Sequence, residues 1–338
     1  MPFIAENISL KSFNTFGVLS HARWFTEINS ENDLLELHNT GQLIMKPLLV
    51  LGGGSNVLFT RDFEGLIVHM NIKGISSRVE GDTVLVTAGG GEIWHDLVSY
   101  CVKREFAGVE NLSLIPGSVG ASPIQNIGAY GVELMDVFYS CKALDIETGL
   151  IKEFDNAACK FSYRDSVFKN DLKGKYIITE VTYKLSKTFN PMLSYGAISD
   201  ELKVRGVLNP SIKDVSDVVS AIRVSKLPDP ETIGNAGSFF KNPIIAAKVF
   251  SGIQSAFPDI VHYVIDNDHI KLAAGWLIEQ CGWKGKVVGH TGTWRNQALV
   301  LVNHGNATGK EIFELSADII KSVQKHFGVT LEREVNII

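Results

Sequence analysis

Cysteine is scarce in this sequence, with four residues in 338: Cys101, Cys141, Cys159 and Cys281. No two of them form a CxxC pair, and no cysteine–histidine spacing resembles a zinc site, so the sequence predicts no bound metal. We expect four buried, reduced thiols, as in proteins of a reducing compartment.

Long apolar runs are missing as well. Residues 1–17 have neither the basic region nor the hydrophobic core of a secretory signal. The apolar stretch at 43–51 is interrupted by Lys46 and Pro47 and is much shorter than the ~20 residues that span a bilayer. The sequence therefore predicts a cytoplasmic protein with no membrane partner.

An excess of positive charge is also absent, because 32 Lys and Arg residues face 37 Asp and Glu residues, for a net charge of -5. Proteins that bind the phosphate backbone usually carry a basic excess, so no nucleic-acid partner is expected. The 45% hydrophobic and 20% charged shares are those of a globular enzyme. A chain of this length is expected to form two or three domains.

Hydrophobic periodicity and turn residues predict a mixed order of helices and strands. Ser30 and Asp33 have the spacing of a helix capping box. Strands are expected at 47–51, 57–59, 66–68, 83–86, 177–185, 298–302 and 334–338, with a hairpin at 142–154. Helices are expected at 93–102, around 215–222, at 272–280 and at 312–327. The regular alternation of a doubly wound sheet is missing, so the predicted fold class is α+β.

A proline pair marks the best candidate linker. Pro228 and Pro230 flank Asp229 and follow the helical pattern around 215–222. Because the residue before a proline avoids the helical conformation, the helix is expected to end here.

A first glycine cluster, GGGSN at 52–56, follows a predicted strand. It lacks the GxGxxG pattern, because residue 57 is valine, and it lacks the GK[ST] ending of a phosphate loop. A turn of small residues can still present successive backbone N–H groups to a pyrophosphate. Tight structural turns also use glycine, so both interpretations stay open.

A second segment, IPGSVGASPIQNIGAYG at 115–131, holds four glycines, two prolines and two amides. This composition excludes a regular helix or strand, and its many backbone donors and acceptors would suit a flat heterocycle such as an isoalloxazine. The alternative is a long structural loop.

Six motifs occur in an order that resembles one known family. They are GGGSN, the 115–131 segment, YRDS at 163–166, KLPDP at 226–230, GNAGSFFKNP at 234–243 and LEREV at 331–335. Together with NTFG at 14–17, they resemble the UDP-N-acetylenolpyruvoylglucosamine reductases (MurB). The SYG at 194–196 looks like the subgroup with a tyrosine-bearing substrate loop. Asn336 departs from the family pattern, where arginine is more often expected.

The resemblance implies non-covalent FAD held by a two-part region of the vanillyl-alcohol-oxidase type, and a smaller α+β domain for a UDP-sugar. The implied boundaries are 1–68 for the first FAD-binding domain, with a strand from 330–338 returning to it. The second FAD-binding domain would span 69–227, and the substrate domain 228–329. NADPH would be the reductant, without a fingerprint of its own, and the protein would be a monomer.

The resemblance also implies roles for individual residues. Ser238 would deliver a proton to carbon, and Arg164 and Glu334 would stabilise negative charge on the substrate carboxylate. The implied cofactor-binding residues are Gly52, Gly53, Gly54, Ser55, Asn56, Pro116, Gly117, Ser118, Gly120, Ala121, Gln125, Asn126 and Ile127. The implied substrate-binding residues are Tyr163, Tyr195, Arg223, Lys226, Asn242 and Gln297.

The residues by themselves leave other interpretations open. Without the resemblance, Arg164 would be expected in a salt bridge, Glu334 as an exposed carboxylate and Ser238 as a cap or turn residue. Two other functions also compete: a flavin oxidase of the same superfamily acting on an alcohol or amine, and a non-catalytic nucleotide-sugar-binding protein. The oxidase would not need Ser238, Arg164 and Glu334, and the binding protein would not need the two glycine-rich loops.

Overall fold

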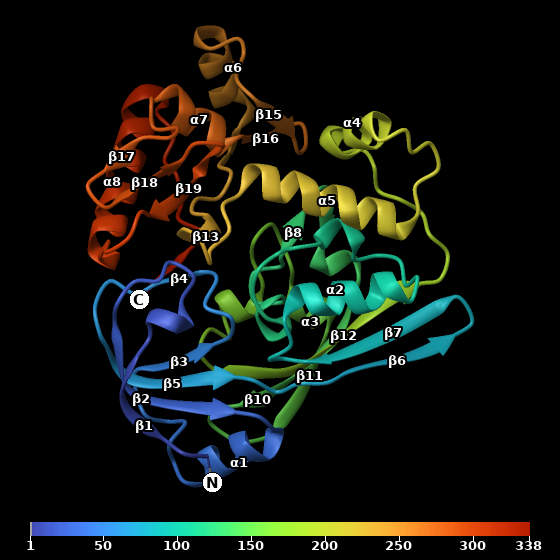
Figure 1. Ribbon diagram of the computed structural model, residues 1–338, viewed down its shortest axis with the longest axis vertical. Coiled ribbons are helices and arrows are strands. Elements are labelled where there is room, and N and C mark those ends of the chain that lie inside the picture. The colour runs from blue at the N-terminus through green and yellow to red at the C-terminus, as the bar shows by residue number, and fades with distance from the viewer. Residues whose placement is uncertain (1) are drawn as a thin grey trace. The chain divides into compact units, whose positions relative to one another are not determined.

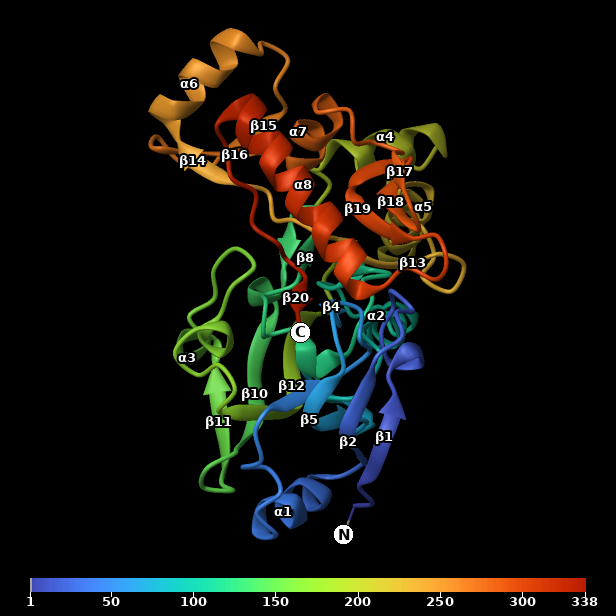
Figure 2. The same cartoon turned by 90° about the vertical axis from the view of Figure 1, so that its left-hand side faces the viewer.

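The computed structural model describes residues 2–338, and the chain forms two compact units (Figures 1 and 2). Unit 1 comprises Met1–Ile8, Ala22–Gly54 and Glu64–Val224, and unit 2 comprises Ser9–His21, Ser55–Phe63 and Ser225–Ile338. The three domains implied by the resemblance divide the chain differently, because Ser9–His21 and Ser55–Phe63 fall within the implied first domain but belong to unit 2. The boundaries at 68 and 227 stay predictions.

Unit 1 begins with a four-stranded sheet in the order β1-β2-β5-β3, in which β3 and β5 run parallel. Its strands are β1 Ala5–Ser9, β2 His21–Ile28, β5 Phe63–Met70 and β3 Leu48–Leu51. Helix α1, Glu31–Asn39, starts with the predicted capping box: the Asp33 N–H donates to Ser30 Oγ at 3.2 Å, and the Asp33 carboxylate accepts from the Ser30 N–H at 2.9 Å. Leu34 and Leu37 bury the helix face in the core that also holds residues of β5.

The second sheet of unit 1 is antiparallel, in the order β11-β10-β12-β7-β6, and Figure 1 shows β6 and β7 as a long hairpin at its edge. Its strands are β11 Ile151–Asp155, β10 Phe138–Asp145, β12 Tyr176–Ser186, β7 Thr83–Gly89 and β6 Ile75–Glu80. The predicted alternation in β12 is confirmed, because Ile177, Val181 and Tyr183 are buried while Lys184 is exposed. Helix α2, Trp94–Lys103, contributes its apolar face to the same core.

Two helices complete unit 1 around a third core. They are α4 Gly196–Val204 and α5 Ile212–Lys226, which pack through Ile198, Val215 and Val219. The last two residues of α5 are counted with unit 2. The helix ends directly before the two prolines, as predicted. Short elements are α3 Asn156–Cys159, β8 Gly128–Ala129, β9 Val132–Glu133 and a 3-10 turn at Val119–Ala121, so the 115–131 segment is otherwise irregular.

Unit 2 contains two antiparallel sheets in the orders β13-β19-β18-β17 and β14-β16-β15. Their strands are β13 Gly234–Ser238, β19 Gln297–Asn303, β18 Thr291–Trp294, β17 Val287–Val288, β14 Ile244–Ala246, β16 His269–Leu272 and β15 His262–Val264. Helix α8, Gly309–Phe327, runs along the first sheet (Figure 2), and α6 is Ala247–Ala256. Helix α7, Ala274–Gln280, starts later than predicted, because Leu272 still pairs with His262 as the last residue of β16.

The last strand is shorter than predicted: β20 covers only Asn336–Ile337, parallel to β4 at Val57–Leu58. Within residues 2–338, no helix combines the length and apolarity that a membrane crossing requires. Sheets and helices are mixed without regular alternation, and the predicted α+β class is confirmed.

Candidate active site

The two predicted glycine segments meet in unit 1. A Cβ atom on Gly53 would lie 3.3 Å from the Cα of Gly117, and one on Gly52 would lie 2.1 Å from Ser118 Oγ. The first approach is tighter than most real Cβ contacts and the second is closer than real Cβ atoms come, so the turn after β3 and the 115–131 segment pack closely against each other. The structure thus brings together two groups of residues that lie more than sixty positions apart in the chain.

A third glycine segment, Gly89–Gly91 at the end of β7, joins them and was missed by the sequence reasoning. The Gly120 N–H donates to the Gly90 carbonyl at 2.8 Å, and a Cβ on Gly120 would lie 3.0 Å from Gly90 Cα. The signal was available: a second run of three glycines begins three residues after the strand predicted at 83–86.

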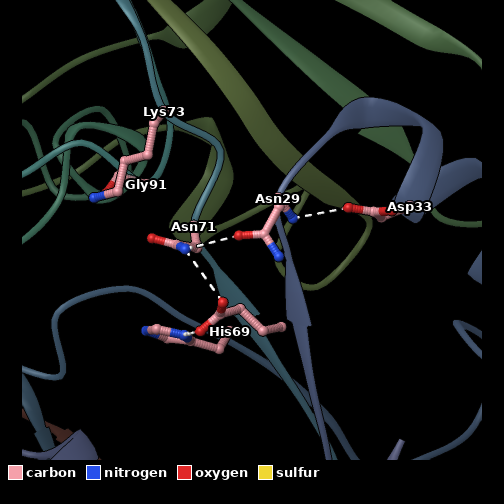
Figure 3. Close-up of polar contacts among 7 residues, drawn as sticks. Asn29, Asp33, His69, Asn71, Lys73 and Gly91 are labelled. Atoms are coloured by element: carbon pink, nitrogen blue, oxygen red, sulfur yellow. Dashed lines mark hydrogen bonds and ion pairs between the residues drawn. The ribbon is translucent and has the colours of Figure 1, made fainter. Parts of the chain in front are cut away.

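Residues 71–74 support this third segment from the other side (Figure 3). The Gly91 N–H donates to the Ile72 carbonyl at 2.9 Å, and Lys73 Nζ donates to the Gly91 carbonyl at 2.5 Å. Asn71 is itself fixed, because its Nδ2 donates to Asn29 Oδ1 at 2.8 Å. Four backbone segments (52–54, 117–120, 89–91 and 71–74) are therefore stacked in unit 1, and we call them the glycine stack.

The glycine stack fits the FAD that the sequence predicts. Its joints leave little or no room for a Cβ, so main chain rather than side chains forms them. Such a surface suits a pyrophosphate and the hydrogen-bonding edge of a flat ring system.

Asn126 and Arg164 organise the second half of the 115–131 segment. The buried Asn126 side chain donates to Glu133 Oε2 at 2.8 Å and to the Ser162 carbonyl at 3.0 Å, and its Oδ1 accepts from the Met135 N–H at 3.0 Å. Arg164 Nη2 donates to the Gly128 carbonyl at 2.6 Å. Arg164 has a left-handed backbone, with φ +56°, a conformation that costs an L-residue energy and that persists only where surrounding contacts hold it.

Arg223 lies in the same unit and close enough to Arg164 for their charges to interact. Burial lowers the pKa of the Arg223 guanidinium below its ordinary value, Tyr130 acts to raise it, and the charge of Arg164 lowers it further. Two neighbouring guanidinium groups destabilise each other and are relieved by an anion. The rings of Tyr130 and Tyr195 contact each other edge to face, with centroids 5.3 Å apart, and Arg164 lies 5.4 Å from the ring centroid of Tyr163.

Ser238 and Glu334 lie on neighbouring extended segments of unit 2. Ser238 ends β13 opposite Val300, after an irregularity in the register at which Gly237 has φ +64°. The Glu334 N–H donates to the carbonyl of Phe239, the residue after Ser238, at 2.8 Å. Asn56 holds the same segment, because its Nδ2 donates to the Glu334 carbonyl at 3.3 Å.

Asn242 and Gln297 meet at the first turn of α7. Asn242 Oδ1 accepts from the Ala274 N–H at 2.9 Å, and a Cβ on Gly275 would lie only 2.8 Å from Gln297 Oε1. The helix start therefore fixes the Asn242 amide and lies close to the Gln297 amide. Lys226 is exposed at the last residue of α5.

The remaining predicted residues divide between the units. Ser55 belongs to unit 2, as Asn56 does, whereas Gly54 and the predicted cofactor residues from Pro116 onward belong to unit 1. Ser118 and Ile127 are buried, Gln125 is half-buried, and Pro116 and Ala121 are exposed.

Comparison with known proteins decides the family. Residues 229–338 match the model of the C-terminal domain of UDP-N-acetylenolpyruvoylglucosamine reductase, and residues 27–155 match an FAD binding domain. The UDP-N-acetylenolpyruvoylglucosamine reductase of Flavobacterium johnsoniae is 48% identical over 337 residues, 99% of each chain. The chain belongs to this reductase family. The enzyme of the same name from Amoebophilus asiaticus is 50% identical over 336 residues, again 99% of each chain.

A solved structure agrees with the fold of this reductase. The crystal structure of UDP-N-acetylenolpyruvylglucosamine reductase (MurB) from Thermus caldophilus matches with a TM-score of 0.69 and 22% identity, covering 100% of this chain and 99% of the other. Membership of the reductase family makes the chain an FAD-binding oxidoreductase of peptidoglycan synthesis. The match to the FAD binding domain, at residues 27–155, spans all four segments of the glycine stack.

Proposed function

We propose that this reductase uses NADPH to reduce the enolpyruvyl group of UDP-N-acetylglucosamine-enolpyruvate, which gives UDP-N-acetylmuramate. One alkene carbon gains a hydride and the other gains a proton, so the C=C bond becomes a single bond with two new C–H bonds. The chemistry that FAD supplies when bound is the transfer of the hydride from NADPH to the alkene. The chain's own residues bind the substrate, stabilise charge and deliver the proton.

Arg164 and Glu334 are assigned to the substrate carboxylate. Hydride addition moves negative charge onto this carboxylate and gives it enolate character, so a planar guanidinium that donates to its two oxygens stabilises the developing charge. Glu334 can assist only when protonated or through a water molecule, because two carboxylates repel each other. The role of Arg164 is supported by its hydrogen bond to the Gly128 carbonyl, which orients the guanidinium before substrate binds.

Ser238 is assigned as the proton donor. A serine hydroxyl is a weak acid, so it needs a neighbour that strengthens or recharges it, and Lys226 is the candidate. The position of Ser238 at the end of β13, next to Phe239, whose carbonyl accepts from the Glu334 N–H, supports a fixed backbone for the proposed donor.

The other predicted residues bind the ligands in this proposal. Arg223 and Lys226 suit the charge of the diphosphate, and the amides of Asn242 and Gln297, with Tyr195 and Tyr163, suit sugar hydroxyls and carboxylate oxygens. The predicted cofactor residues from Gly52 to Ile127 would hold FAD. NADPH and the UDP-sugar both carry a diphosphate, so they would use the same binding residues in turn.

The observation that carries the proposal is the 48% identity, across 99% of each chain, to the UDP-N-acetylenolpyruvoylglucosamine reductase of Flavobacterium johnsoniae. All the assigned residues are present in this sequence. The absence of a membrane-crossing helix among residues 2–338 agrees with a small, phosphorylated, water-soluble substrate. We further propose that the protein acts as a monomer in the cytoplasm.

Anaerobic absorption spectroscopy on the purified, flavin-loaded protein tests the proposal. NADPH should bleach the flavin band, and UDP-N-acetylglucosamine-enolpyruvate should restore it in a one-to-one ratio. Colour that returns only with oxygen would identify an oxidase instead. A protein that takes up no flavin after reconstitution would contradict the proposed reaction.

A further inference from the structure

Four hydrogen bonds around Leu114 connect the start of α2 to Arg223, all within unit 1. The Leu114 N–H donates to His95 Nδ1 at 2.9 Å, and the Leu114 carbonyl accepts from Arg223 Nε at 3.1 Å. On either side, Trp94 Nε1 donates to the Leu112 carbonyl at 2.8 Å, and the Trp94 N–H donates to the Gly117 carbonyl at 3.0 Å. Residues 112–117 are therefore fixed at three points by two consecutive residues of α2.

Leu114 itself is strained, because its φ of +59° lies in the left-handed region. A leucine rarely adopts this conformation, which persists only where its surroundings hold it. Trp94 fixes the neighbours of Leu114, but only His95 bonds the Leu114 N–H and only Arg223 bonds its carbonyl among the described contacts. The orientation of the Leu114 carbonyl, and with it that of Arg223, therefore depends on the acceptor at His95.

We infer that His95 is a positioning residue for substrate binding: its Nδ1 lone pair fixes the Leu114 backbone, whose carbonyl holds the Arg223 guanidinium toward the diphosphate. This inference rests on the proposed role of Arg223. Nothing in it requires His95 to contact the substrate or to transfer a proton.

The imidazole must be neutral to do this. A ring nitrogen that accepts from an N–H cannot carry a proton, so the proton of neutral His95 lies on Nε2. The electrostatics agree, because burial lowers the pKa of His95 below 6.5, Asp96 on the same helix acts to raise it, and Arg223 from α5 lowers it. The unfolded chain thus binds a proton here more readily than the folded chain. The stabilisation is complete above pH 6.5 and is lost as the pH falls through the lower pKa of the folded state.

Two substitutions at His95 distinguish the effect of losing the hydrogen-bond acceptor from the effect of losing the ring. In His95→Asn, the side-chain carbonyl oxygen stands two bonds from Cβ, where Nδ1 stood, and can accept from Leu114. In His95→Gln, the oxygen reaches one bond further, to the position of Nε2, and the Leu114 N–H loses its acceptor. Because the partly buried N–H then lacks an acceptor, we expect a roughly tenfold effect on a coupled equilibrium.

The first measurement uses the flavin-loaded full chain. With UDP as the probe, we expect His95→Gln to raise the Kd about tenfold, whereas His95→Asn stays within about threefold of the original protein. In turnover, His95→Gln should raise KM for the UDP-sugar and change kcat little. Flavin content should be equal in all three proteins, because Trp94 still fixes residues 112 and 117. Equal UDP affinities in the two variants would overturn the inference.

The second measurement needs no ligand and so separates this inference from the proposed reaction. Nitrogen-15 NMR should find the proton of His95 on Nε2, and the Arg223 Nε–H should exchange with solvent faster in His95→Gln than in His95→Asn. A proton on Nδ1, or the same Arg223 exchange rate in both variants, would overturn the positioning role even if the enzyme reduces the UDP-sugar. Failure of turnover with the expected exchange rates would count against the proposed reaction alone.

Discussion

The glycine stack of unit 1 and the candidate groups of unit 2 use different parts of the residue. The glycine stack uses main chain, and its joints leave little or no room for a Cβ. In unit 2, the candidate groups are side chains (Ser238, Glu334, Asn242 and Gln297) that are placed by strand pairing or a helix start. The difference predicts opposite responses to mutation: the glycine stack is sensitive to added atoms, and the side-chain groups of unit 2 are sensitive to a changed functional group.

The largest effect should come from removing a functional group in unit 2. Ser238→Ala deletes the proposed proton donor, so we expect the reoxidation of the flavin by the UDP-sugar to slow about a hundredfold or more, while reduction by NADPH stays nearly unchanged. Anaerobic stopped-flow spectroscopy measures both steps. Ser255→Ala removes an exposed hydroxyl of α6 and is the matched control. Equal losses in the two steps would contradict the proton-donor role.

The second-largest effect should come from adding side-chain atoms to the glycine stack of unit 1, and it should appear in FAD affinity. Gly53→Val places a β-branched side chain where a Cβ alone would lie 3.3 Å from Gly117 Cα. Overpacking of this kind costs about 1–3 kcal/mol, so we expect FAD affinity to fall roughly tenfold or more, measured by flavin titration of the apoprotein. Gly252→Val is the control in unit 2, because a Cβ on Gly252 would meet nothing within 4 Å. Full flavin occupancy in Gly53→Val would mean that this turn does not bind FAD.

A smaller effect is expected where an added atom displaces a functional side chain. In Gly275→Ala, the new methyl group would lie 2.8 Å from Gln297 Oε1, and the flexible end of that side chain can move away. Stability should therefore change little, whereas KM for the UDP-sugar should rise about fivefold, the equivalent of one lost hydrogen bond. Steady-state kinetics and thermal unfolding distinguish the two. An unchanged KM would remove Gln297 from the substrate site.

The smallest effect should come from removing a helix cap, and the loss of unfolding free energy should be equal in the two units. Ser30 caps α1 in unit 1 and Thr308 caps α8 in unit 2, each by accepting from the backbone N–H three residues on. Ser30→Ala and Thr308→Ala should each cost about 1 kcal/mol in urea unfolding. A transition that moves for one variant and not for the other would show that the two units unfold separately.

Local patterns predicted most of the secondary structure. The capping box at Ser30, the alternation in β12 and the end of α5 before Pro228 each depend on residues a few positions apart, so the sequence contains the whole signal. Where two elements compete for the same residues, the prediction failed. Leu272 was included in α7, because its apolar spacing fits a helix and its pairing with His262 is not visible in the sequence.

The site was predictable in composition but not in assembly. The motifs named Gly52–Gly54 and residues 115–131, yet the sequence could not show that Gly89–Gly91 packs between Gly120 and Asn71. The connection from His95 through Leu114 to Arg223 was equally hidden, because it depends on one left-handed leucine and a contact across 109 positions. Long-range backbone contacts leave no periodic pattern in a sequence.

The glycine stack also has a genetic consequence. Where two side chains meet, a larger residue on one side can be compensated by a smaller one on the other. At the contacts of Gly53 with Gly117 and of Gly120 with Gly90, both partners already lack a side chain, and at Gly91 the facing atoms are the backbone of Asn71. No smaller residue exists, so a harmful substitution there leaves no second-site suppressor at the contact itself. A suppressor screen on Gly120→Ala should recover true revertants, whereas one on Gln297 variants should also recover changes in neighbouring side chains.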